Sequence, residues 1–442
     1  MIKSAVDILR NLNPDFKKLL SGSGLVLFFK VFGSLAGYLI AFVITKNYGA
    51  DTFGLFELAL TFLTIFSVLG RMGLDGALVR FIPEHTENKN FNALRASYRF
   101  AISAALPIAI ILGMVTFFAA DFFEMWFDVE GLASYLKIVA FTIPFSTWMG
   151  LNSEAFRGMK EMVSYSIYQR GTVLLLAILA IYLGDSFYPS TPELTIFSYG
   201  IGVAALAFAS GVFTPIKVRS LGEPSSTFSD FKAASMLNVA LPMLLSTSMF
   251  MVMNWTDTLM IGYYLDARDV GIYRIAFKIA ALITFAQFAI NSIAAPMFSS
   301  FKAKKDMQGL RKMVRNIGYL NLLISGPAFL FIILFPNFLL ELFGSEFSEG
   351  VLPLIILAIG TVINALCGPV MYLLNMTGKE RSARNIIIIA SVINIALNYY
   401  LIPQYGLMGA AYATSISTVI WNALAVIKIK RVYGFISIPH PF

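Results

Sequence analysis

The sequence predicts an all-α polytopic membrane protein with about 12 transmembrane helices in two six-helix lobes. Three observations support this fold. Of the 442 residues, 58% are apolar and 13% are charged, whereas soluble domains have about 25% charged residues. Apolar runs long enough to cross a bilayer recur along the whole chain. A turn-and-helix stretch near the N-terminus also returns, with nearly the same pattern, in the second half.

Each predicted transmembrane helix is an apolar run of roughly 20 residues, the length that crosses a hydrocarbon core about 30 Å thick at a rise of 1.5 Å per residue. Lipid offers no water to backbone groups, so these runs must be helical. The six spans of the first half are 24–45, 53–72, 98–119, 133–151, 163–183 and 195–213. The six spans of the second half are 237–263, 270–292, 316–336, 350–374, 385–402 and 406–427.

These spans divide the chain into three parts. The first 20 residues are basic with scattered apolar positions, which is typical of an amphipathic helix lying on the membrane surface. We therefore expect a cytoplasmic interfacial segment at 1–23, an N-lobe at 24–225 and a C-lobe at 226–442.

The positions of lysine and arginine predict the orientation of the spans. With a cytoplasmic N-terminus, the inner segments hold 26 of the 33 lysines and arginines, and the outer segments hold only Lys46 and Arg268. Basic residues concentrate on the cytoplasmic side of membrane proteins. The net charge of +8 is therefore explained by topology, so a nucleic-acid partner is not needed. Both termini are predicted to be cytoplasmic.

Residues with catalytic or metal-binding chemistry are scarce. The single cysteine, Cys367, excludes an internal disulfide framework. The two histidines, His85 and His440, stand far apart and do not form a metal-ligand cluster. The outer connections are all shorter than 16 residues and carry no paired-carboxylate or histidine–carboxylate site. We expect no catalytic residues, no metal and no cofactor, and therefore a protein that is not an enzyme.

Two sequence pairs indicate an internal duplication. YGADTFGLFELA at 48–59 aligns with YLDARDVGIYRIA at 264–276, with Gly54 on Gly271 at an offset of 217 and Glu57 on Arg274. FRGMKE at 156–161 aligns with MTGKER at 376–381 at an offset of 220. Six helices per repeat give both lobes the same orientation, related by an axis along the membrane normal. This architecture is typical of transporters that handle a substrate between their lobes.

Five charged residues within the spans are the main site candidates. An ionisable residue deep in the membrane costs ~2.5–3.5 kcal/mol on insertion scales, so it normally faces a cavity or a partner. Lys30, Arg274 and Lys278 could form a cationic patch that receives a pyrophosphate, whose oxygens accept charge-assisted hydrogen bonds. Glu57 and Asp257 could act as gate or ion-coupling carboxylates, with Glu57 near Arg274 and Asp257 near Lys278. Alternatively, the pairs only latch the lobes together and Lys30 snorkels to the interface.

Uncharged polar residues within the spans have two interpretations. They could line a sugar-binding cavity, or they could hydrogen-bond between helices as ordinary packing contacts. The residues concerned are Asn254, Gln287, Asn291, Asn364, Asn394 and Asn398.

Three stretches carry a resemblance to a known family: ITKNYGADTFGLFELALTF, NWTDTLMIGYYLDARDVGIYRIAFKIA and YGLMGAAYATSIST. They resemble the polysaccharide transport (O-antigen flippase) family of the multidrug/oligosaccharidyl-lipid/polysaccharide exporter superfamily. The resemblance implies a MATE-like, V-shaped pair of bundles with the first, second, seventh and eighth helices lining a central cavity. It also implies alternating-access movement of a polyprenyl-pyrophosphate-linked oligosaccharide from the inner to the outer leaflet of a prokaryotic cell membrane.

The expected partners follow from this hypothesis: the bilayer, the lipid-linked oligosaccharide used in surface polysaccharide biosynthesis, H⁺ or Na⁺ as a coupling ion, and polysaccharide polymerase or assembly proteins. An ion-coupled multidrug exporter of the same fold is the main alternative. The three candidate cations argue against it, and Glu57 and Asp257 keep it open. A polytopic polysaccharide polymerase or glycosyltransferase is a remote alternative, because no catalytic constellation is evident in the sequence.

Overall fold

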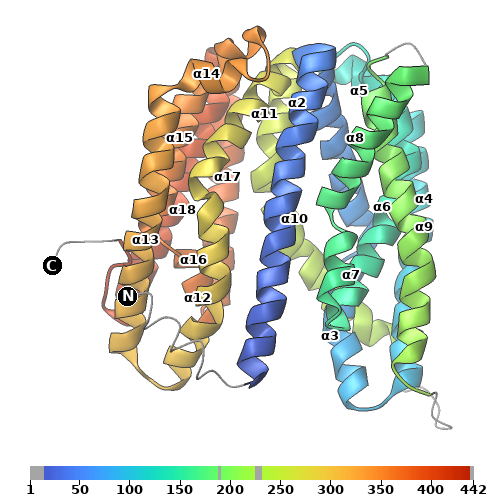
Figure 1. The fold of residues 1–442 in the computed structure, drawn as a ribbon, viewed down its shortest axis with the longest axis vertical. Helices are drawn as coiled ribbons and strands as arrows, with labels where there is room; N and C mark the ends of the chain where they lie inside the picture. Colours follow the sequence, from blue (N-terminus) through green and yellow to red (C-terminus); the bar gives the residue numbers. More distant parts are fainter. Residues whose placement is uncertain (1–13, 188–190, 224–230, 439–442) are drawn as a thin grey trace.

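The computed structural model describes residues 14–187, 191–223 and 231–438, and nearly all of these are helical. In Figure 1 most helices of the first half, in blue to green, gather on one side and most of those of the second half, in yellow to red, on the other, while the start of α10 (Ala233–Tyr264) reaches the first half and packs against α3 (Leu74–Glu87). The helix α2 (Pro14–Arg71) runs between the two groups.

The helix α2 contains two of the predicted spans, because it is kinked at Gly49. Gly49 has φ 83° and ψ −178°, a conformation that glycine adopts at little cost. We refer to residues 14–48 as the first leg of α2 and to residues 50–71 as its second leg. The other helices of the first half are α3 (Leu74–Glu87), α4 (Phe91–Phe118), α5 (Ala120–Phe127), α6 (Leu132–Gly158), α7 (Met162–Ile167), α8 (Arg170–Phe187) and α9 (Leu194–Ser220).

The second half begins with α10 (Ala233–Tyr264) and α11 (Ala267–Ala281). It continues through η1 (Leu282–Thr284), α12 (Phe285–Ala303), α13 (Met307–Leu334), α14 (Pro336–Glu341), η2 (Ser345–Gly350), α15 (Val351–Cys367), α16 (Val370–Met376), α17 (Glu380–Tyr405) and α18 (Leu407–Tyr433). All twelve predicted spans fall on these helices. Within the described residues, seven helices are long and apolar enough to cross a membrane. The chain is therefore a multi-pass membrane protein, while the count of twelve and the cytoplasmic termini stay predictions.

Three predicted spans are interrupted within their length, and a fourth, 316–336, contains the break at Phe335 near its end. The span 163–183 is broken by a turn at Tyr168 and Gln169, 270–292 by η1, and 350–374 at Gly368, which has φ 79°. Hydropathy reports only how apolar a run is, so it cannot detect a break that tertiary contacts impose. The interfacial segment expected at 1–23 stays a prediction, because residues 1–13 lie outside the described part of the chain, and residues 14–23 are part of α2.

Two pairs of helices have equal lengths in the two halves. The helices α4 and α13 each have 28 residues, and α9 and α18 each have 27. This agreement is independent of the sequence pairs and supports the duplication. The boundary expected at 225/226 lies outside the described residues, so the division into lobes there stays a prediction. Below, N-lobe and C-lobe denote α2–α9 and α10–α18.

The second leg of α2 crosses α11 at two glycines. A Cβ atom at Gly54 would lie 1.6 Å from the carbonyl oxygen of Ala267, and a Cβ at Gly271 would lie 2.4 Å from that of Ala50. The two contacts are reciprocal, as at a two-fold interface, because both the glycines and the alanines are 217 positions apart. Only glycine permits this approach. The crossing places Glu57 and Arg274, three residues beyond the glycines, beside each other.

Candidate functional site

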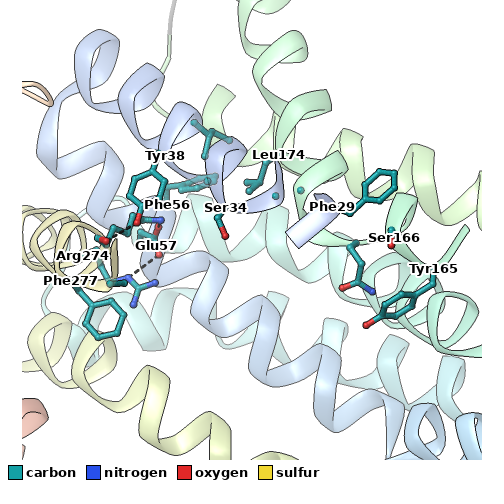
Figure 2. A pocket seen from close by; sticks show the side chains of 17 residues that line it. Phe29, Ser34, Tyr38, Phe56, Glu57, Tyr165, Ser166, Leu174, Arg274 and Phe277 are labelled. Carbon is teal, nitrogen blue, oxygen red and sulfur yellow. Dashed lines mark hydrogen bonds and ion pairs between the residues drawn. The ribbon is translucent and has the colours of Figure 1, made fainter. Parts of the chain in front are cut away.

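A cavity of about 370 Å³ lies between the lobes. Its walls come from both legs of α2 and from α7 and α8 on the N-lobe side, and from α11 on the C-lobe side. Figure 2 shows Glu57 and Arg274 at one end of the cavity and Tyr165 and Ser166 at the other. One end is therefore charged, and the other carries hydroxyl groups.

Glu57 binds two cations at the charged end. Its Oε2 accepts a hydrogen bond from Nε of Arg274 at 3.0 Å, and its Oε1 lies 2.9 Å from Nζ of Lys278. The Glu57 side chain is 1% exposed, whereas those of Arg274 and Lys278 are 10% and 17% exposed. We call these three residues the charged triad. The structure places Glu57 against Arg274, as the duplication predicted.

The expected contact between Lys278 and Asp257 is wrong, since Lys278 pairs with Glu57. Arg274 and Lys278 are four residues apart and share one face of α11, which is turned toward the second leg of α2. Asp257 lies on α10 and faces α17 and α18 through its hydrogen bonds. Sequence spacing identified neighbouring helices but not which faces meet.

Aromatic rings support the two cations. The Arg274 guanidinium lies 5.0 Å from the ring centroid of Trp255 and 5.5 Å from that of Phe277, and Lys278 Nζ lies 5.7 Å from that of Phe53. Such contacts stabilise a desolvated cation. One carboxylate against two cations leaves the triad with a net charge of +1. A partly buried site with this charge favours an anionic ligand in the adjoining cavity.

Several residues of the cavity wall were not identified from the sequence. Tyr38 donates a hydrogen bond to the carbonyl oxygen of Lys278 at 2.7 Å, which ties the first leg of α2 to α11. Ser34, Tyr165, Ser166 and Gln169 also line the cavity. Nothing in their local sequence distinguishes them from packing residues. The side chain of Lys30, the third predicted cation, lies outside the described part of the structure.

Asp257 lies in a separate, fully polar cluster of the C-lobe. It accepts hydrogen bonds from Tyr273 at 2.9 Å, Asn398 at 2.6 Å, Asn394 at 3.4 Å and Thr414. The residue is 4% exposed, and all four of these donors are neutral. The spacing of the two asparagines on one face of α17 was the only signal in the sequence for this cluster.

None of the six uncharged residues predicted as possible cavity lining is among the described residues that line this cavity. Asn364 accepts a hydrogen bond from Asn422 at 3.1 Å, which is an ordinary interhelical contact. Gln287 and Asn291 are buried, and among described groups Nε2 of the first and Oδ1 of the second have no hydrogen-bond partner. Asn254 is exposed on α10.

Comparison with known proteins places this arrangement in a family. Residues 19–302 match the family described as polysaccharide biosynthesis protein. The chain belongs to this family. Residues 242–400 also match the MatE family, which agrees with membership of the exporter superfamily expected from the sequence.

Relatives of this polysaccharide biosynthesis family member include two proteins of Haloferax volcanii. One is a probable flippase, AglR, 25% identical over 419 residues that cover 92% of this chain and 83% of the relative. The other is a probable low-salt glycan biosynthesis flippase, Agl15, 26% identical and covering 90% of this chain and 81% of the relative. Among solved structures, the lipid II flippase MurJ in an inward closed conformation superposes with a TM-score of 0.71 at 15% identity, covering 92% of this chain and 87% of that one. The chain therefore has the MurJ- and MATE-like helical fold.

Proposed function

We propose that this protein is a flippase that moves a polyprenyl-pyrophosphate-linked oligosaccharide from the inner to the outer leaflet of a prokaryotic plasma membrane. The observation that carries the proposal is the charged triad, with its net charge of +1, at the wall of a cavity between two lobes. The relatives described above include two probable flippases, and a further relative is a probable multidrug resistance protein, NorM, of Oceanobacillus iheyensis. The product would serve surface polysaccharide assembly, where polymerase or assembly proteins are the expected partners.

The triad offers donors for a diphosphate. Arg274 uses Nε on Glu57, so its terminal N–H groups can be directed at phosphate oxygens. Lys278 carries three N–H donors and supplies a second positive charge. Glu57 keeps the two side chains beside the cavity when no anion is bound. An arriving diphosphate would be attracted to both cations and would compete with Glu57 for them.

The same ion pairs join the lobes, which gives a route from substrate binding to movement. Glu57 lies on the second leg of α2, and its two partners lie on α11. Near the glycine crossing, the backbone N–H of Ala50 donates to Oε1 of Glu346 at 2.8 Å, which is a second contact between the halves. An anion that draws Arg274 and Lys278 away from Glu57 weakens the crossing and favours separation of the lobes at this end.

We further propose Asp257 as the site of the coupling cation, H⁺ or Na⁺. A buried carboxylate with only neutral partners is costly, and either a proton or a cation would compensate its charge. The cluster also holds Oδ1 of Asn398, a buried acceptor without a hydrogen-bond partner in the described structure. Carboxylate, amide and hydroxyl oxygens are ligands suited to hard cations.

The function is tested with the purified protein in proteoliposomes. A polyprenyl-pyrophosphate-linked oligosaccharide labelled on its glycan is placed in one leaflet, and its arrival in the other is followed with an impermeant quencher. We expect translocation that requires the protein. The MatE match and the Asp257 cluster favour a second candidate, an ion-coupled exporter. If an imposed Na⁺ or H⁺ gradient drives transport of a cationic dye and the labelled lipid is not translocated, the result favours the exporter and rejects the flippase.

A further inference from the structure

The fifth helical segment differs between the two halves. In the C-lobe, α17 is a continuous helix of 26 residues. Its counterpart in the N-lobe runs over the same length, from Met162 to Phe187, but is divided into α7 and α8 by the turn at Tyr168 and Gln169. Under the predicted duplication, one copy of this element is continuous and the other is broken.

The break lies where the segment lines the cavity. Tyr165 and Ser166, in the last turn of α7, and Gln169, in the break itself, all line the cavity. At membrane depth, non-helical backbone is tolerated only where it is buried in protein or lines a water-filled cavity. Broken helices of this kind mark substrate sites in other transporter folds. The position of the break therefore indicates contact with a ligand.

The three side chains that line this end of the cavity, Tyr165, Ser166 and Gln169, are neutral. The Gln169 amide donates from Nε2 to Oγ of Ser153 at 2.8 Å, which leaves its Oε1 as an acceptor. Ser166 donates to the carbonyl oxygen of Met162 at 2.8 Å, so its hydroxyl oxygen can still accept. Tyr165 adds a hydroxyl group and an aromatic ring, over which the Arg157 guanidinium lies 5.8 Å from the ring centroid. Neutral acceptors and donors beside an aromatic ring suit a sugar, whose hydroxyl groups both donate and accept.

The two ends of the cavity are spaced for one ligand. Cavity residues on the first leg of α2 extend from Phe29 to Ile40, or ~16 Å along the helix at 1.5 Å per residue. Tyr38 bonds to the backbone of Lys278 near the charged end. Nearer the other end, a Cβ at Gly33 would lie 3.3 Å from Cα of Gly171, just past the break. A diphosphate and the sugar attached to it can span this distance.

We propose that Tyr165, Ser166 and Gln169 form a subsite for the sugar residue attached to the pyrophosphate. This inference rests on the proposed function, because the charged triad must hold the diphosphate for the sugar to reach α7. The α7–α8 break would then select the first sugar of the glycan, while the triad would recognise any polyprenyl diphosphate.

The test compares two ligands on the full-length protein in lipid nanodiscs. One is bare polyprenyl pyrophosphate. The other is a panel of polyprenyl pyrophosphates that each carry a single hexose or N-acetylhexosamine. Gln169→Ala should weaken binding of the best sugar-bearing lipid about tenfold, the loss expected for one or two hydrogen bonds, and leave binding of the bare lipid unchanged. Tyr165→Phe keeps the ring and should give a smaller loss of the same selectivity. Lys278→Ala should weaken both ligands alike.

The control is Thr172→Ala, a polar-to-alanine change one turn beyond the break at a residue that is not among those lining the cavity. It should bind both ligands as the wild type does. If Gln169→Ala and Tyr165→Phe leave the preference for sugar-bearing lipid intact, or weaken both ligands equally, the subsite is rejected while the flippase proposal stands. If the wild type binds neither ligand, the proposed function itself fails.

Discussion

Glu57 and Arg274 occupy equivalent positions of the two halves, 217 residues apart, and form an ion pair of 3.0 Å across the boundary between the lobes. A reciprocal crossing brings equivalent residues together, so an exact repeat would place like charges face to face. Because one position carries the Glu57 carboxylate and the other the Arg274 guanidinium, the two side chains attract each other. Lys278 then adds the second cation, which makes the pair a site with net positive charge.

The first prediction concerns the sign of the charge at the triad. Lys278→Ala and Arg274→Ala should each lower translocation of the lipid-linked oligosaccharide by roughly tenfold to a hundredfold, the value of a charge-assisted hydrogen bond. Lys278→Arg should retain transport because the charge remains. The measurement is translocation in proteoliposomes, or surface polysaccharide display in a flippase-deficient cell, with protein level recorded. Full transport by a variant with both alanines at normal protein level would end the cationic-site proposal.

The second prediction separates binding from latching. Glu57→Arg alone places three cations together at a residue that is 1% exposed, which should destabilise the protein by about 3–5 kcal/mol. Adding Arg274→Glu restores a pair of inverted polarity, so thermal stability should recover. Transport should not recover, because one of the two cations has moved from α11 to α2. Recovery of both stability and transport would show that the residues act only as a latch.

The third prediction concerns the glycine crossing. Gly54→Ala introduces a Cβ that would lie 1.6 Å from a backbone oxygen of α11, so the two helices must move apart. A cysteine placed at the fully buried Ala50, on a Cys367→Ser background, should then react faster with a maleimide. Gly326→Ala is the matched control, since nothing lies within 4 Å of its added Cβ. Unchanged reactivity in the Gly54→Ala variant would contradict the close packing.

The fourth prediction tests Asp257 as the cation site. Asp257→Asn has nearly the same shape and removes a buried charge, so the protein should fold and its thermal stability should be equal or higher. Stimulation of transport, or stabilisation of the wild type, by Na⁺ or by low pH should be lost in this variant. Thermal denaturation across Na⁺ concentrations and pH values measures the effect. The same response to Na⁺ and pH in the wild type and the variant would reject Asp257 as the cation site.

The fifth prediction concerns the topology. The 26-to-2 distribution of lysine and arginine predicts that the turn near Gly49 is outside and the C-terminal end of α18 inside. Because Ala50 is buried, exposed Asp51 is the better labelling position, with Val432 as its counterpart on α18. On the Cys367→Ser background, an impermeant maleimide applied to intact cells should label Asp51→Cys and spare Val432→Cys. The opposite pattern would reverse the orientation.

The sequence by itself determined the helical class, the multi-pass membrane character and the family. These depend on local composition and on motif spacing along the chain. Long apolar runs in a bilayer form helices because lipid offers no hydrogen-bond partners to the backbone. It also predicted the contact of Glu57 with Arg274, because the predicted duplication puts these residues on equivalent helical turns of two halves that face each other.

Only the tertiary structure decided which helix faces meet. The rotation of each helix about its own axis follows from packing with distant segments, which hydropathy does not record. Lys278 therefore forms its ion pair with Glu57 and not with Asp257. Asp257 accepts hydrogen bonds from Tyr273 on α11 and Thr414 on α18. The break beside Gln169 could not be predicted for the same reason. An interrupted helix and a continuous one can have the same apolar composition, and the hydrogen bonds at the break involve Ser153 on α6, which donates to the carbonyl oxygen of Tyr165 and accepts from Gln169.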